Sequence, residues 1–160
     1  MDCVRGIDFL CSRKEINKKK IAVFGGSQGG GLSFATASLD QRVSLCAPVV
    51  PFLAHWKKYF KTSDWPEMNE WVESKKERTW EKTLETLSYF DSMNLATRIQ
   101  CPVFMGVGLQ DPVCPPATNF AALNHTKGPK KYQVYANANH SLGPTHQERV
   151  RDWIRENFNP

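Results

Sequence analysis

The residues with the clearest chemical meaning form the run Gly25-Gly26-Ser27-Gln28-Gly29-Gly30-Gly31. It contains the pattern G-x-S-x-G, and it lies between an apolar run and a segment with helical periodicity. In that context the pattern is typical of a strained strand-to-helix turn that lifts the hydroxyl of Ser27 out of a sheet. Gly25 and Gly29 must then be tiny because strand and helix nearly collide. The N–H of Gln28, at the start of the helix, would face the same site and can donate to an oxyanion.

Other glycine-rich binding sites require different sequence patterns. A dinucleotide fingerprint, G-x-G-x-x-G, needs glycine where Ser27 or Gln28 stands. A phosphate-binding P-loop needs lysine where Gly31 stands. The remaining alternative to a nucleophile is a glycine-rich turn with an idle serine.

A serine hydroxyl is a weak nucleophile until a base takes its proton and a carboxylate orients that base. In the known strand-to-helix arrangement the order along the chain is serine, acid, histidine, and the acid follows a late strand. Asp111 comes directly after the apolar run 102–108 and therefore fits the acid. The alternative is that Asp111 only caps a turn before Pro112.

The chain has four histidines, of which His140 fits the base. It lies in a loop between the apolar run 132–135 and the last predicted helix. His55 precedes the acid in the chain, and His125 ends a predicted helix. His146 falls in the first turn of the last helix and is predicted to be a surface residue.

The elements that must position these side chains alternate between strands and helices. Unalternating apolar runs predict strands at 21–24, 43–50, 102–108 and 132–135. Helical periodicity predicts helices over 3–12, from 32 to about 40, after Pro116, and after a capping box formed by Thr145 and Glu148. Two further helices form an insertion at about 52–90. This order indicates an α/β fold with a mostly parallel sheet, in which strand 21–24 is buried on both faces.

The composition excludes several classes of protein. The chain has 160 residues, a formal net charge of +5, 41% hydrophobic and 23% charged residues, which does not fit a disordered chain. Lysines occur in short groups that are predicted to be solvated faces, so no nucleic-acid partner is expected. No apolar run reaches the roughly 18 residues of a membrane span. Five cysteines without C-x-x-C spacing indicate neither a disulfide framework nor a zinc site. The absence of a signal peptide at the start favours the cytoplasm.

Two stretches resemble a known family. The run at 25–31, and the segment 108–118 with the pattern G-L-x-D-x-x-C-P-P-x-T, are similar to the acetyl xylan esterase and cephalosporin-C deacetylase family, carbohydrate esterase family 7 of the α/β-hydrolase superfamily. The similarity runs through nearly the whole chain. It implies a triad of Ser27, Asp111 and His140 with Gln28 in the oxyanion hole. It further implies removal of acetyl groups from xylan oligosaccharides or similar small esters, no metal or organic cofactor, and a homo-oligomer, usually a ring-shaped hexamer.

One departure from the family concerns length. Family members are about twice as long, and this chain begins at the helix before the nucleophile strand. Residues 1–160 are therefore expected to form a single partial α/β-hydrolase domain, without the upstream loop whose tyrosine gives the second oxyanion donor in the family. Two alternatives remain open. One is a serine peptidase of the prolyl-oligopeptidase type, against which the C-P-P-x-T segment argues, and the other is a non-catalytic, truncated oligomerising fragment.

Overall fold

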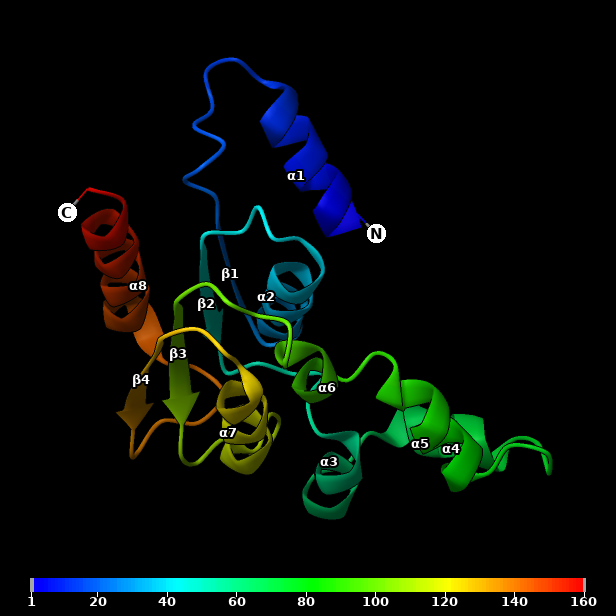
Figure 1. Ribbon diagram of the computed structural model, residues 1–160. Helices are drawn as coiled ribbons and strands as arrows, with labels where there is room; N and C mark the ends of the chain where they lie inside the picture. Colours follow the sequence, from blue (N-terminus) through cyan, green and yellow to red (C-terminus); the bar gives the residue numbers. More distant parts are fainter. Residues whose placement is uncertain (1, 160) are drawn as a thin grey trace.

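A parallel sheet of four strands forms the centre of the protein in the computed structural model, which describes residues 2–159. The strands are β1 (Ala22–Gly26), β2 (Leu45–Val49), β3 (Val103–Gly108) and β4 (Lys130–Tyr135), and they lie side by side in that order. All four predicted strands are present, and the predicted parallel sheet is confirmed. Because the strands are parallel, the loops that follow them meet at one edge of the sheet (Figure 1).

Helices cover both faces of the sheet and make it the middle of three layers (Figure 1). One face packs against α2 (Gln28–Leu39), α6 (Ser92–Ala96) and α7 (Pro116–His125), and α1 (Asp2–Ser12) adds Ile7 to the same core. The other face packs against α8 (Gly143–Phe158). Successive side chains along β3 point to opposite faces of the sheet. Met105 therefore lies in the core on the first face, and Phe104 lies in the core under α8 on the other face.

The insertion between β2 and β3 contains more helices than the sequence predicts. Segment 52–90 forms three helices, α3 (Trp56–Thr62), α4 (Pro66–Glu73) and α5 (Trp80–Ser88), and the unpredicted α6 follows. The expectation of two helices is therefore wrong. Helices of five and seven residues, such as α6 and α3, are too short to show a periodic pattern.

The carboxylate of Asp91 caps the N-terminal ends of both of these short helices. It accepts hydrogen bonds from the backbone N–H groups of His55 at 2.7 Å and Trp56 at 3.0 Å, where α3 starts, and from Met93 at 2.9 Å in α6. Such bonds satisfy amides that have no partner inside a helix. Helices α4 and α5 then project away from the sheet (Figure 1).

Strand β1 lies at an edge of the sheet. Within residues 2–159 it pairs only with β2, and 68% of Phe24 is exposed. The expectation that this strand is buried on both faces is therefore wrong. A groove of about 580 Å³ runs along β1 between α1 and α2.

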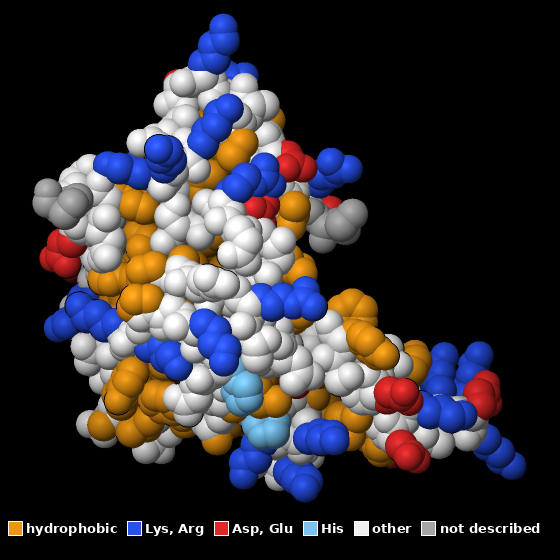
Figure 2. Space-filling view, viewed as in Figure 1, with side chains coloured by type: hydrophobic (Ala, Val, Ile, Leu, Met, Phe, Trp, Pro, Cys, Tyr) orange, Lys and Arg blue, Asp and Glu red, His pale blue; other side chains and the backbone are white. Residues whose placement is uncertain are grey.

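Charged side chains are scattered over the visible face between hydrophobic areas. Figure 2 shows separate groups of Lys and Arg on this face, with Asp and Glu among them on the projecting helices. Among residues 2–159, no helix combines the length and the apolar character needed to cross a membrane.

Candidate active site

Ser27 occupies the strained turn between β1 and α2. Its backbone has φ 54° and ψ −119°, a region that non-glycine residues rarely adopt. Three backbone hydrogen bonds hold it there: Ser27 N–H donates to the carbonyl of Val49 at 2.9 Å, and the carbonyl of Ser27 accepts from Gly31 at 3.1 Å and Phe52 at 2.9 Å. The surrounding structure therefore fixes the strained conformation that the sequence pattern predicts.

The glycines of the turn differ in how much space a Cβ atom would have at each position. A Cβ atom on Gly25 would lie 2.6 Å from the carbonyl oxygen of Gly29, so strand and helix do nearly collide there. A Cβ atom on Gly29 itself would meet nothing within 4 Å, and the prediction that this side chain must be absent is wrong. On Gly31 a Cβ would collide with the carbonyl of Phe52. On Gly30 a Cβ would lie 2.9 Å from the carbonyl oxygen of Val49, so the turn depends on Gly25, Gly30 and Gly31.

His140 lies within hydrogen-bond distance of both other predicted site residues, Ser27 and Asp111. His140 Nε2 is 2.9 Å from Ser27 Oγ, and His140 Nδ1 is 2.9 Å from Asp111 Oδ2. Asp111 is 4% exposed, and its second oxygen accepts the backbone N–H groups of Val113 and Cys114, each at 2.9 Å. These two hydrogen bonds fix the position of the carboxylate next to the imidazole. The imidazole can accept a proton from the serine hydroxyl and return it.

The loops after β3 and β4 are tied together by their backbones. Leu109 N–H donates to Tyr135 at 3.1 Å, and Gln110 N–H donates to Ala138 at 2.9 Å. A Cβ atom on Gly108 would collide with the carbonyl of Asn139, so the glycine lets the second loop lie against the end of β3. This role of Gly108 was not predicted from the sequence, although a glycine at the end of a strand is a signal of close backbone approach.

Gln28 is the first residue of α2. The first amides of a helix have no acceptor within the helix, and they carry its positive dipole end. The Gln28 N–H, which directly follows Ser27, can therefore donate a hydrogen bond to an anion bound at the start of α2. A pocket of about 400 Å³, lined in part by Ser27, His140 and Leu142, opens beside the serine.

Cys114 is the other potential nucleophile near the site. Its Sγ lies 4.0 Å from Ser27 Oγ in the buried interior. Burial, with a smaller effect of the Asp111 carboxylate, raises the pKa of Cys114 to about 12. The thiol is therefore protonated at neutral pH, which makes it a poor nucleophile.

The side chains of Asp111, Cys114 and His140 could also be considered as metal ligands, since their donor atoms lie within 4.8 Å of one another. Asp111 and His140 already hydrogen-bond each other, and Cys114 Sγ lies 4.0 Å from Ser27 Oγ. The hydrogen-bond relay from Ser27 through His140 to Asp111 therefore accounts for this cluster without a metal ion.

His146 is fully buried, and the prediction that it is a surface residue is wrong. Helix α8 begins at Gly143, without a side-chain cap, and not at the predicted capping box. His146 lies four residues before Val150 and seven before Trp153, so it shares their buried face of α8. Its ring packs there against Phe104, and its Nδ1 lies 3.1 Å from the hydroxyl of Tyr135. Burial lowers the pKa of His146, and Arg149 adds to the effect.

Comparison with known proteins places this geometry in a family. The model of the acetyl xylan esterase (AXE1) family matches residues 1–157. The chain belongs to the acetyl xylan esterase family. Acetyl esterase Axe7A of Xylanibacter ruminicola is 40% identical over 131 residues, which are 81% of this chain and 29% of that protein.

Solved structures of this family have the same fold. An acetyl xylan esterase from Paenibacillus sp. R4 is 44% identical with a TM-score of 0.91, over 97% of this chain and 51% of that one. Acetyl xylan esterase 1 from Thermoanaerobacterium sp. JW/SL YS485 is 31% identical with a TM-score of 0.89, again over 97% and 51%. The chain thus spans about half the length of these family members.

Proposed function

We propose that this chain carries the catalytic residues of a carboxylic ester hydrolase that removes acetyl groups from xylan oligosaccharides or similar small esters. The observation that supports it most is the continuous hydrogen-bond path from Ser27 through His140 to Asp111, with 2.9 Å at both steps. Family membership supports an acetyl group as the acyl group transferred to Ser27 and a carbohydrate hydroxyl as the leaving group.

Acylation begins when Ser27 Oγ attacks the carbonyl carbon of the acetyl ester and His140 Nε2 takes the hydroxyl proton. The carbonyl oxygen becomes an oxyanion, to which the Gln28 N–H donates a hydrogen bond. The C–O bond to the sugar then breaks. The departing sugar oxygen takes the proton from His140, and the acetyl group stays on Ser27. Asp111 holds the imidazole in the tautomer that this transfer needs.

Deacylation repeats the steps with water. His140 Nε2 removes a proton from the water as its oxygen attacks the acetyl carbon on Ser27, and a second oxyanion forms at the same donor. The ester bond to Ser27 Oγ breaks, the proton returns to that oxygen, and acetate leaves. No step requires a metal or an organic cofactor, because the three side chains and one backbone amide supply every proton and hydrogen bond used.

The experiment that tests this proposal compares three substrates. The chain is expected to release 4-nitrophenol from 4-nitrophenyl acetate and acetate from acetylated xylo-oligosaccharides, and the Ser27→Ala variant is expected to release neither. Hydrolysis of aminoacyl 4-nitroanilides in place of the acetyl esters would instead support a serine peptidase. An intact, folded chain without any turnover would support a non-catalytic fragment.

The proposal includes self-association through the edge of the sheet. Strand β1 has unpaired backbone groups on its outer side within residues 2–159, and Phe24 is mostly exposed beside them. Such an edge is a template for pairing with another chain. Sedimentation of the purified protein should therefore show a homo-oligomer, and replacing Phe24 with lysine should shift it toward the monomer. A wild-type chain that stays monomeric at all concentrations contradicts this part of the proposal.

A further inference from the structure

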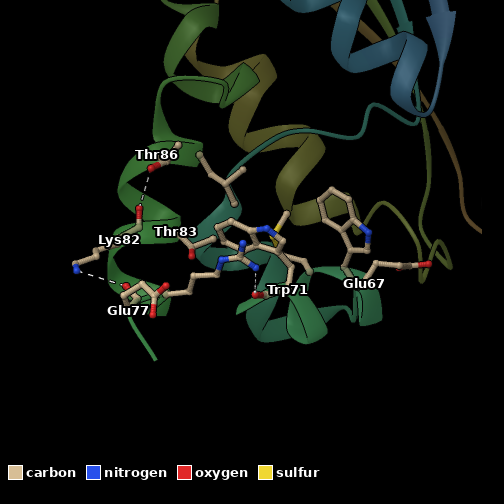
Figure 3. Close-up of a pocket in the computed structure, with 10 residues that line it drawn as sticks. Glu67, Trp71, Glu77, Lys82, Thr83 and Thr86 are labelled. Carbon is tan, nitrogen blue, oxygen red and sulfur yellow. Dashed lines mark hydrogen bonds between the residues drawn. The ribbon is translucent and has the colours of Figure 1, made fainter. Parts of the chain in front are cut away.

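A second pocket, of about 470 Å³, lies between α4 and α5, and none of Ser27, Asp111 and His140 lines it. Its apolar wall consists of Trp65, Met68, Trp71 and Leu87. Trp71 is 46% exposed, an unusually open position for an indole ring, and Figure 3 shows it at the centre of the pocket with α5 on the opposite side. This volume is in the range of sites that bind small molecules.

Arg78 fixes the orientation of Trp71. Its guanidinium carbon lies 4.1 Å from the ring centroid, and its Nη1 donates to the carbonyl of Trp71 at 2.9 Å and to Ser74 Oγ at 2.7 Å. The guanidinium therefore stacks on the indole, and its two hydrogen bonds to the Trp71 carbonyl and the Ser74 hydroxyl keep it there. A ligand can contact a ring that is already in place, which reduces the entropy cost of binding.

The charges of the pocket balance. Two carboxylates, Glu67 and Glu77, and two cations, Arg78 and Lys82, line it together with the hydroxyl of Thr86 (Figure 3). Figure 2 shows the same mixture of signs over this part of the surface. A site without net charge does not favour a phosphate, a carboxylate or an ammonium group. It suits a neutral molecule that has one apolar face and many hydroxyl groups, which both donate and accept hydrogen bonds.

The pocket is also tied to the site described above. The ring of Trp65 packs edge-on against Phe52 with 5.5 Å between centroids, and the Phe52 N–H bonds the carbonyl of Ser27 at 2.9 Å. On the other side, Ser63 Oγ, between α3 and α4, donates to the carbonyl of Pro112 at 2.8 Å, next to Asp111. The pocket therefore keeps a fixed position relative to the nucleophile and the acid.

We propose that the pocket between α4 and α5 binds a pyranose unit of a neutral oligosaccharide chain, with the apolar face of the sugar on the part of the Trp71 ring that Arg78 leaves open. The choice of a carbohydrate rests on the proposed function, while the neutral, aromatic character of the site stands on its own. Holding a remote unit of the chain raises the effective concentration of its acetyl groups at Ser27. Polymeric substrates then gain an advantage over small esters.

The test is an NMR titration of the Ser27→Ala chain with xylohexaose, followed on the indole N–H signals of the five tryptophans. Up to about 10 mM sugar, a range suited to millimolar dissociation constants, the signals of Trp71 and Trp65 should move together. The signal of Trp153, on the buried side of α8, should stay in place. The Trp71→Ala variant should bind about tenfold more weakly.

A matched control removes a different exposed aromatic ring. Tyr89, 74% exposed just after α5, does not line the pocket, and Tyr89→Ala should change the affinity by less than about twofold. If Trp71→Ala disturbs the fold, Trp71→Phe keeps an apolar ring and should still weaken binding about threefold. Equal losses in the Tyr89 and Trp71 variants would overturn the proposal.

Three other outcomes decide against this pocket: no movement of the Trp71 signal, equal binding of the charged chain hexagalacturonate, or movement with protein concentration alone, which indicates contact between copies. Turnover of 4-nitrophenyl acetate separates the two proposals. A chain that is inactive toward this ester but shows the Trp71 shift counts against the proposed function and for the pocket. An active chain without the shift counts the opposite way.

Discussion

Adding one methyl group at Gly25 is expected to damage both the stability and the chemistry of the protein. The new Cβ would lie 2.6 Å from the carbonyl oxygen, 2.7 Å from the carbonyl carbon and 3.0 Å from the Cα of Gly29. These are backbone atoms at the start of α2, so no flexible side chain can move aside. Ordinary contacts between such atoms need roughly 3.5 Å, so the helix start must move by nearly 1 Å. Overpacking of this kind costs about 1–3 kcal/mol of unfolding free energy.

The same displacement moves Ser27, which lies between the two glycines. A shift of about 1 Å in a reacting group lowers turnover roughly 100-fold. We therefore expect Gly25→Ala to lower the urea midpoint, followed by circular dichroism, and to lower kcat for 4-nitrophenyl acetate by about two orders of magnitude.

Gly29→Ala is the matched control for Gly25→Ala. Its Cβ would meet nothing within 4 Å, and alanine suits the first turn of α2 better than glycine, with a gain of about 0.5–1 kcal/mol. The variant should be at least as stable as the natural chain and retain its turnover. A Gly25→Ala variant with natural stability and activity, or a Gly29→Ala variant that is equally damaged, would refute the steric reasoning.

Three further predictions concern the side chains around the nucleophile. Asp111→Asn should lower kcat about 10³- to 10⁴-fold without unfolding the chain, because the imidazole of His140 then loses the partner that selects its tautomer; a loss below tenfold in ester assays contradicts this role. Cys114→Ala should keep turnover within about tenfold of the natural chain, because the buried thiol stays protonated; loss of all activity would instead make it the nucleophile in place of Ser27. Because burial lowers the pKa of His146 in the folded state, the unfolded chain binds the proton more readily, so its contribution to stability is complete above about pH 6.5 and is lost as the pH falls below that value. Urea titrations at several pH values should show this fall, and His146→Gln should flatten it.

The sequence predicts the part of the site that depends on strand order. Ser27, Asp111 and His140 each follow a strand of one parallel sheet, and parallel strands bring the loops at their ends to one edge. The apolar runs that mark these strands are strong local signals. The contact of three side chains from distant parts of the chain was therefore predictable from the order of the elements.

The errors arise where a local pattern has a competing explanation. Thr145 and Glu148 have the spacing of a capping box, but Pro144 already sits in the first turn, so α8 starts at Gly143. The burial of His146 has a different cause, because His146 lies four residues before the buried Val150 and seven before the buried Trp153. This helical spacing, and not the exact start of the helix, decides which face of α8 the side chain occupies.

The roles of individual glycines could not be read from their spacing. The pattern G-x-S-x-G suggests a steric requirement at both ends, yet only Gly25 meets a close neighbour, and Gly29 has open space around its missing side chain. The requirement at Gly31 comes from Phe52, and that at Gly108 comes from Asn139. Both neighbours are more than twenty residues away in the chain, so only the folded structure reveals these contacts.

The most direct test of the central claim is covalent labelling with a serine-directed fluorophosphonate, followed by intact mass and peptide mapping. The relay predicts one adduct per chain, located on Ser27, and its disappearance in the His140→Ala variant because the hydroxyl then has no base. Labelling of the natural chain at Cys114, or no labelling of a chain that circular dichroism shows to be folded, would contradict the assignment of Ser27 as the activated nucleophile.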